Sequence, residues 1–147
     1  MIGPSPRLIE FDDGWTLEPG RGTVLREGSD ATVFSYGPVM LHEALVASER
    51  LAARGLDVQV VDLPWLNRFD PEWLADTAGG DEVFVLEDHS PVGGLGDGVR
   101  AALARPVRVF GVEGWPACGT PHEALRAHGL DGPSLADRIA VALRTTA

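Results

Sequence analysis

The chain has 147 residues, a single cysteine and a formal net charge of −10 at pH 7. This length predicts one domain that folds without internal disulfides and buries about 68–70% of its unfolded surface. The acidic charge argues against nucleic acid as a partner, because such binding depends on neutralising phosphates with lysine and arginine. The sequence holds no run of 18 apolar residues and starts without a signal-like segment, so we expect no membrane span and a cytoplasmic location.

Residues 1–29 form the first predicted unit, an extended linker. Proline and glycine interrupt it repeatedly and no hydrophobic period persists, which is typical of a connecting segment. One short strand is expected within it, at Thr23–Arg26. The second predicted unit, the main domain, is residues 30–147.

Strands and helices alternate through the main domain. Apolar runs predict strands at residues 31–36, 57–62, 83–86 and 106–110. Helical spacing and capping residues predict helices at residues 38–52, 70–78, 90–104, 120–129 and from residue 134 onward. Because strands alternate with helices, we expect a mostly parallel sheet with helices on both faces. The strand at residues 83–86 has no polar alternation, which suits a parallel strand covered on both faces.

The run VFVLEDHSPVGGLGDG, residues 83–98, holds the densest group of candidate functional residues. Ser90 is expected to cap the following helix, with Pro91 at its first position. Four glycines follow within six residues, and each glycine inside a helix costs about 1 kcal/mol relative to alanine. We therefore expect a second helix, another subunit or a ligand to approach this backbone closely.

The chemistry of this run has several interpretations. GGLGDG fits neither G-x-G-x-x-G nor G-x-x-x-x-G-K-[ST], so close packing or an interface is favoured over a phosphate loop. Asp88, His89 and Ser90 are adjacent, and adjacent side chains cannot form the relay of a hydrolase triad. One interpretation is that His89 gains and loses a proton in a functional role at the end of the strand. We favour the other, in which His89 hydrogen-bonds to backbone or to a neighbouring chain.

The remaining candidates are weaker. Cys118 precedes a helix N-terminus, where a thiol pKa can fall, but no base is assignable and an inert residue is favoured. Trp65 and Trp73 are expected to pack in the core or at its edge rather than to form a recognition surface. The other histidines show no metal-ligand spacing with the cysteine: His42, His122 and His128.

Several stretches, in this order and spacing, resemble the C-terminal domain of the transketolase family. They are VLREGSDATVFSYGPVMLHEALVASERLAARGLDVQVVDL, FDPEWL, VFVLEDHSPVGGLGDGV and GTPHEALRAHGL. The resemblance covers roughly residues 20–145, and the family includes transketolase, 1-deoxyxylulose-5-phosphate synthase and the β-subunits of 2-oxo-acid dehydrogenases. It implies an α/β fold: a three-layer α/β/α sandwich on a five-stranded, mostly parallel sheet whose first short strand, Thr23–Arg26, is antiparallel.

The resemblance also implies a function. In such enzymes one preceding domain grips the diphosphate of thiamine diphosphate and its magnesium, and a second holds the aminopyrimidine. The C-terminal domain packs against both and stabilises the dimer. This chain lacks both preceding domains, and residues 2–11 look like the tail of the pyrimidine-binding domain. Arg7 is the nearest match to a family arginine that contacts a sugar phosphate, but that role is not carried over.

The resulting hypothesis is the C-terminal subunit of a split, thiamine diphosphate-dependent transketolase-like enzyme that transfers two-carbon ketol units. This chain alone would be inactive and would provide no catalytic, cofactor-binding or metal-binding residue. Its partners would be subunits carrying the other two domains, in a hetero-oligomer. The expected interface residues are His89, Gly93, Gly94 and Gly96.

Three alternatives stay open. The first is a non-catalytic binding or regulatory module that keeps the fold. The second is the corresponding subunit of a 2-oxo-acid dehydrogenase-type enzyme, and the third is a fragment of a longer chain. The residues that would distinguish the substrates lie in the other domains.

Overall fold

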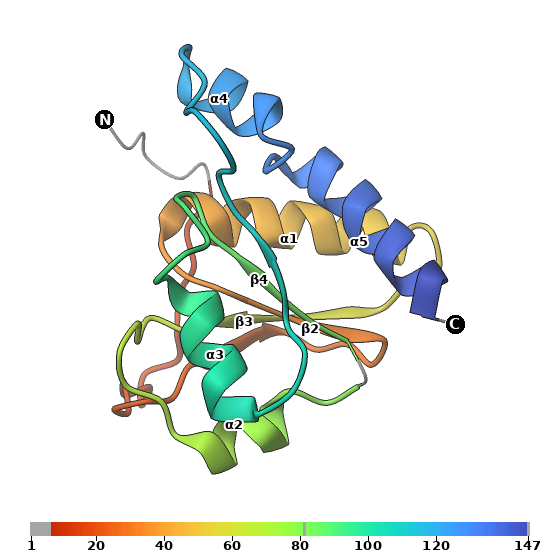
Figure 1. Ribbon diagram of the computed structural model, residues 1–147. Helices are drawn as coiled ribbons and strands as arrows, with labels where there is room; N and C mark the ends of the chain where they lie inside the picture. Colours follow the sequence, from red (N-terminus) through yellow and green to blue (C-terminus); the bar gives the residue numbers. More distant parts are fainter. Residues whose placement is uncertain (1–6, 81, 147) are drawn as a thin grey trace.

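The computed structural model describes residues 7–80 and 82–146, which form a sheet between two layers of helices (Figure 1). The strands are β1 (Thr23–Arg26), β2 (Ala31–Ser35), β3 (Val58–Asp62), β4 (Glu82–Leu86) and β5 (Arg108–Phe110). The helices are α1 (Pro38–Ala52), α2 (Pro71–Thr77), α3 (Leu95–Leu103), α4 (Pro121–Ala127) and α5 (Gly132–Thr146).

The sheet has the order β1-β3-β2-β4-β5. β1 pairs antiparallel with β3, and the other neighbours pair in parallel. The predicted fold class, including the antiparallel first strand, is confirmed. The predicted boundary between residues 29 and 30 stays a prediction; β1 itself belongs to the same sheet as the strands that follow it.

Two apolar clusters lie on opposite faces of the sheet. One fills the space between the sheet and α1 with α5, and the other fills the space between the sheet and α2 with α3 (Figure 1). In β2, Val33 points into the first cluster and Phe34 into the second. Burial on both faces explains why the run at residues 83–86 of β4 is apolar without alternation. The polar side chains of Thr32 and Gln59 are also buried, in β2 and β3.

Several helix ends that were predicted from local capping residues agree with the structure. Gly55, just past α1, has φ 77°, and the N–H of Leu56 donates to the carbonyl of Leu51, as in a glycine-terminated helix. Asp70 caps α2 by accepting the N–H of Trp73 at 3.0 Å. Thr120 caps α4 in a full capping box.

Two predicted helix starts are wrong. α3 begins at Leu95, not at Ser90 and Pro91, because the chain between them takes a loop that includes Gly93 at φ 77°. The hydroxyl of Ser90 accepts a bond from the N–H of Val92 within this loop. α5 begins at Gly132, two residues before the predicted start, and the Gly132 N–H donates to the carboxylate of Glu43 in α1.

Candidate functional site

The candidate site lies at the topological switch point of the sheet, between the neighbouring strands β2 and β4. β2 leads into α1 on one face of the sheet, whereas its neighbour β4 leads into α3 on the other face. In open α/β sheets, the crevice at the carboxyl ends of such strands is the usual place for a ligand. Tyr36, which follows β2, and Glu87 and His89, which follow β4, meet there.

Glu87 is the residue that organises this site. Its side chain is 0% exposed, and its carboxylate accepts the N–H groups of Leu95 at 3.0 Å and Gly96 at 2.9 Å. These are free donors of the first turn of α3, and a negative charge is favourable there because it faces the positive end of the helix dipole. Glu87 therefore does the capping that the sequence assigns to Ser90.

The glycines beside Glu87 are explained within the chain. A Cβ on Gly94 would lie 1.8 Å from Oε2 of Glu87, and one on Gly96 would lie 2.3 Å from Cγ2 of Val109. The close approach expected at these glycines is made by side chains of this same chain. Gly93 differs, since it is exposed and a Cβ there would have no neighbour within 4 Å.

The ring of His89 is held from both sides. Nδ1 lies 2.7 Å from the carbonyl oxygen of Ser90, and because a carbonyl only accepts, Nδ1 carries a proton. Nε2 lies 2.7 Å from the hydroxyl oxygen of Tyr36 and 3.1 Å from Oε2 of Glu87. In the neutral ring Nε2 accepts the Tyr36 O–H, and in the charged ring it donates to the carboxylate. The backbone bond agrees with the interpretation favoured from the sequence.

Tyr36 is kept in its hydroxyl form. Burial raises the pKa of this hydroxyl, and the nearby negative charges of Glu87 and Asp88 raise it further. The cluster thus holds two sets of bonds: those from the first turn of α3 to Glu87, and those of His89 with the Ser90 carbonyl and the Tyr36 hydroxyl. Together they hold the loop after β4 in place. In it, His89 meets the carbonyl of Ser90 rather than its hydroxyl, so the serine is not activated.

The four predicted interface residues lie together at this loop but differ in accessibility. Gly96 is buried and Gly94 is half-buried, whereas Gly93 is exposed and the side chain of His89 is 43% exposed. Their role in an interface stays a prediction. Glu87 and Tyr36 were not predicted as site residues from the sequence. The available signal for Glu87 was its position as an acidic residue directly after an apolar strand.

The other candidates lie apart from this cluster. Trp65 and Trp73 are partly buried against the second apolar cluster, which confirms the packing interpretation. Cys118 is exposed. His128 accepts the N–H of Ala117 through Nε2 at 2.9 Å. Arg7 donates to Glu49 of α1 at 2.8 Å.

The described residues contain neither a cluster of metal ligands nor a membrane-spanning helix. Among residues 7–80 and 82–146, no three His, Cys, Asp or Glu side chains are grouped to hold a metal ion. In the same part of the chain, every helix is too short or too polar to cross a lipid bilayer.

Comparisons with known proteins agree with this fold. Residues 20–135 match the family model described as "Transketolase, C-terminal domain". A solved structure described as "Split gene transketolase, inactive beta4 tetramer" is 36% identical, with a TM-score of 0.81 over 91% of this chain and 46% of that chain.

Two curated relatives are similar in sequence. A transketolase C-terminal section of Methanocaldococcus jannaschii is 32% identical over 138 residues, which are 90% of this chain and 43% of the relative. The 1-deoxy-D-xylulose-5-phosphate synthase of Syntrophotalea carbinolica is 36% identical over 136 residues, or 87% of this chain and 21% of the enzyme. The chain thus spans less than half the length of these relatives. On the match over residues 20–135, it belongs to the transketolase C-terminal domain family.

Proposed function

We propose that this chain is the C-terminal subunit of a split, thiamine diphosphate-dependent transketolase-like enzyme that transfers two-carbon ketol units. The match of residues 20–135 to the transketolase C-terminal domain carries the proposal. The 36% identity to a split gene transketolase supports a separate subunit. The partner in this proposal is a protein that carries the other two domains, and the location is the cytoplasm.

The residues of this chain do not fit the diphosphate of the cofactor. The first turn of α3 would be the natural place for a phosphate, but the Glu87 carboxylate already accepts its N–H groups and would repel a second anion. Among residues 7–80 and 82–146, no three His, Cys, Asp or Glu side chains are grouped as ligands for a metal ion. We therefore assign cofactor binding to the partner and derive no reaction step from this chain.

The role left for this chain is assembly. The loop after β4 is held by three contacts: the bond from the Leu95 N–H to Glu87, the contact of His89 with the Ser90 carbonyl and the bond from the Gly93 N–H to Asp97. The loop therefore presents a fixed surface. Val92 at its tip is 83% exposed, and Gly93 beside it offers accessible backbone. A rigid loop loses little conformational freedom on binding, which favours docking of a partner domain at His89 and Gly93.

Reconstitution tests the proposal. The chain is purified and mixed with a partner protein carrying the two other domains, thiamine diphosphate and magnesium. We expect no ketol transfer by this chain alone and turnover only in the mixture, followed by coupled assay of the aldose and ketose phosphates. Turnover by the isolated chain, or full activity of the partner without it, would contradict the proposal.

A further inference from the structure

The N-terminal segment, which we define as residues 7–22, exposes an unusual amount of apolar surface. Every residue from Glu10 to Pro19 is exposed. The exposed large apolar side chains of the segment are Leu8, Phe11, Trp15 and Leu17. Single exposed apolar residues need no explanation, but a group within ten positions marks an interaction site.

This segment is held in place at three points. Arg7 pairs with Glu49 of α1 at 2.8 Å. The indole N–H of Trp15 donates to the hydroxyl of Thr23 in β1 at 3.0 Å. Near the end of the segment, Arg21 donates to Asp70, the cap of α2, at 2.8 Å. The exposed side chains are therefore presented by a fixed backbone.

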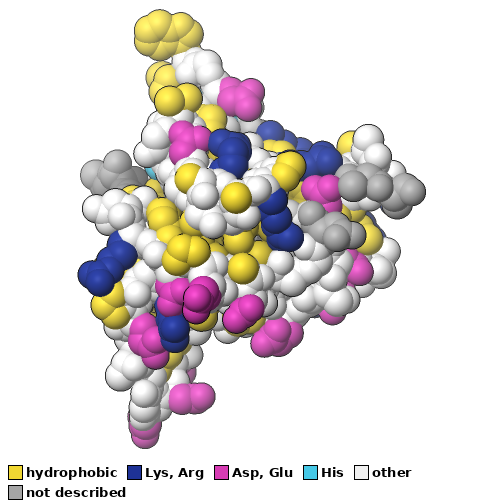
Figure 2. Space-filling model, turned by 60° about the horizontal axis from the view of Figure 1, so that its bottom comes forward, with side chains coloured by type: hydrophobic (Ala, Val, Ile, Leu, Met, Phe, Trp, Pro, Cys, Tyr) yellow, Lys and Arg dark blue, Asp and Glu magenta, His cyan; other side chains and the backbone are white. Residues whose placement is uncertain are grey.

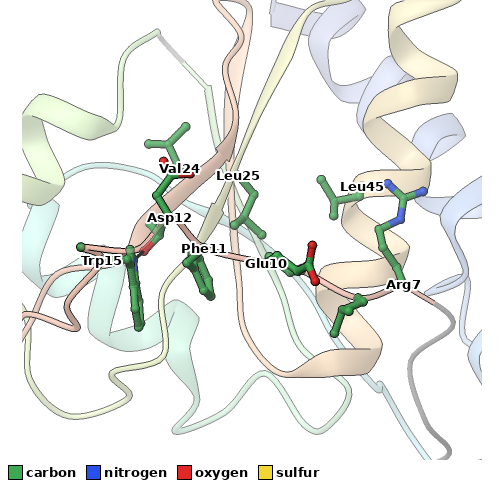
Figure 3. Close-up of a pocket in the computed structure, with 12 residues that line it drawn as sticks. Arg7, Glu10, Phe11, Asp12, Trp15, Val24, Leu25 and Leu45 are labelled. Carbon is green, nitrogen blue, oxygen red and sulfur yellow. Dashed lines mark hydrogen bonds between the residues drawn. The ribbon is translucent and has the colours of Figure 1, made fainter.

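Two of these side chains form a stacked aromatic pair. The rings of Phe11 and Trp15 lie 4.2 Å apart at their centroids, with an angle of 16° between their planes. Figure 3 shows both rings directed the same way, away from β1. A pre-stacked pair adds contact area at little entropic cost, as is typical of the central residues of protein interfaces.

A groove runs between the segment and the body of the domain. Its volume is about 690 Å³, and Val24 and Leu25 of β1 and Leu45 of α1 form its apolar floor. Arg7 and Glu10 lie at one end of the groove and the aromatic pair at the other (Figure 3). The groove is large enough to receive several side chains of another polypeptide.

All the charged side chains of residues 8–17 are acidic. Glu10, Asp12 and Asp13 are exposed, and none forms an ion pair with the described part of the chain. More generally, acidic side chains gather in the lower half of the face shown in Figure 2, in keeping with the net charge of −10. A second copy of this chain carries the same acidic residues and the same net charge of −10, so two copies repel each other at close range. A partner with basic residues around an apolar patch is complementary instead.

We propose that residues 8–17 and the adjoining groove are a docking surface for the partner subunit, which contacts them with an apolar patch rimmed by lysine or arginine. This inference rests on the proposed function. Residues 7–19 directly precede the matched residues 20–135, and in the relatives a C-terminal domain follows the rest of the protein. The segment therefore stands where contact with that preceding part is expected.

The test measures binding to the partner subunit that restores turnover in the reconstitution. The double variant Phe11→Ala/Trp15→Ala is expected to bind at least tenfold more weakly by titration calorimetry. The double variant Asp12→Arg/Asp13→Arg is expected to bind at least tenfold more weakly in 50 mM salt and to lose the salt dependence of the wild type. Circular dichroism checks that each variant is folded.

Matched controls lie on another loop. Trp115 is 95% exposed and Glu113 is exposed, so Trp115→Ala and Glu113→Arg change the same residue types elsewhere. Both are expected to bind as the wild type does.

The outcomes separate the two proposals. Unchanged binding of both double variants to an active partner overturns the docking surface and leaves the proposed function standing. A wild-type chain that dimerises by itself in sedimentation, and loses that dimer in the double variants, also overturns the docking surface. If no partner restores turnover, the proposed function fails and this inference falls with it.

Discussion

At the scale of single residues, Glu87 shows how this fold accommodates a buried charge. A buried carboxylate without partners is costly, but this one accepts two backbone N–H groups and meets His89 at 3.1 Å. Charge-assisted bonds of this kind are about twice as strong as neutral ones. Removing the carboxylate would leave two buried donors without an acceptor.

Glu87→Ala is therefore expected to lower the free energy of unfolding by about 2–3 kcal/mol, the cost of stranding buried donors. Urea denaturation followed by circular dichroism measures this change. Asp88→Ala is the control, since Asp88 is the exposed neighbour and its loss should shift stability by no more than about 0.5 kcal/mol. Equal losses in both variants would contradict a capping role for Glu87.

Asp62, at the end of β3, makes stability depend on pH in the opposite direction to most carboxylates. Burial raises the pKa of its carboxyl to about 6 from an ordinary value of 3.8. Between about pH 4 and 6 the unfolded chain has released this proton while the folded chain still holds it. The contribution of Asp62 to stability therefore falls as the pH rises through this window.

Asp62→Asn removes this titration. The variant is expected to match the wild type in stability near pH 4 and to become the more stable protein as the pH rises to about 6, keeping that advantage at pH 7. Urea midpoints at pH 4, 5, 6 and 7 give the comparison. Parallel pH profiles for the two proteins would show that Asp62 ionises freely in the folded state.

At the scale of elements, α4 packs on the domain only through partly buried side chains such as Leu125, so its capped ends contribute much of its stability. None of its residues is buried. At its start Thr120 accepts the N–H of Glu123, whose carboxylate accepts the N–H of Thr120 at 2.8 Å. The bond from the Thr120 hydroxyl lowers the pKa of Glu123. At its end the Leu130 N–H donates to the carbonyl of Leu125.

Thr120→Ala is expected to destabilise α4 by about 1 kcal/mol, because it removes one half of the capping box. Amide hydrogen exchange in residues 124–127 should become about fivefold faster, which is the same free energy. Ser90→Ala is the matched control, since this serine does not cap α3 and exchange in that helix should stay unchanged. Faster exchange in α3 but not in α4 would contradict this assignment of caps.

The caps also show which part of the structure was predictable. Thr120 and Asp70 lie next to the helices they cap, so local sequence is sufficient to find them. Glu87 caps α3 from across a loop, and Glu43 reaches the start of α5 from 89 residues away. Those two helix starts were misplaced because their acceptors come from tertiary contacts that a local pattern does not contain.

At the scale of the whole molecule, alternating strands and helices were enough to predict the layers and the parallel sheet, and the family resemblance supplied the antiparallel first strand. The site was only partly predictable. The glycine run marked its position, but Tyr36 meets His89 across 53 residues. That contact depends on β2 and β4 lying side by side, which sheet order decides and spacing along the chain does not.

The packing of α5 on α1 has a consequence for how the domain is made. Residues of α1 such as Met40 and Leu51 share one buried cluster with Leu135 and Ile139 of α5. While the ribosome is still adding residues before Gly132, that side of α1 has no helix to cover it. The nascent chain therefore carries an exposed apolar helix face until α5 emerges from the ribosome. The layer of α1 and α5 on this face of the sheet forms only after α5 has been translated.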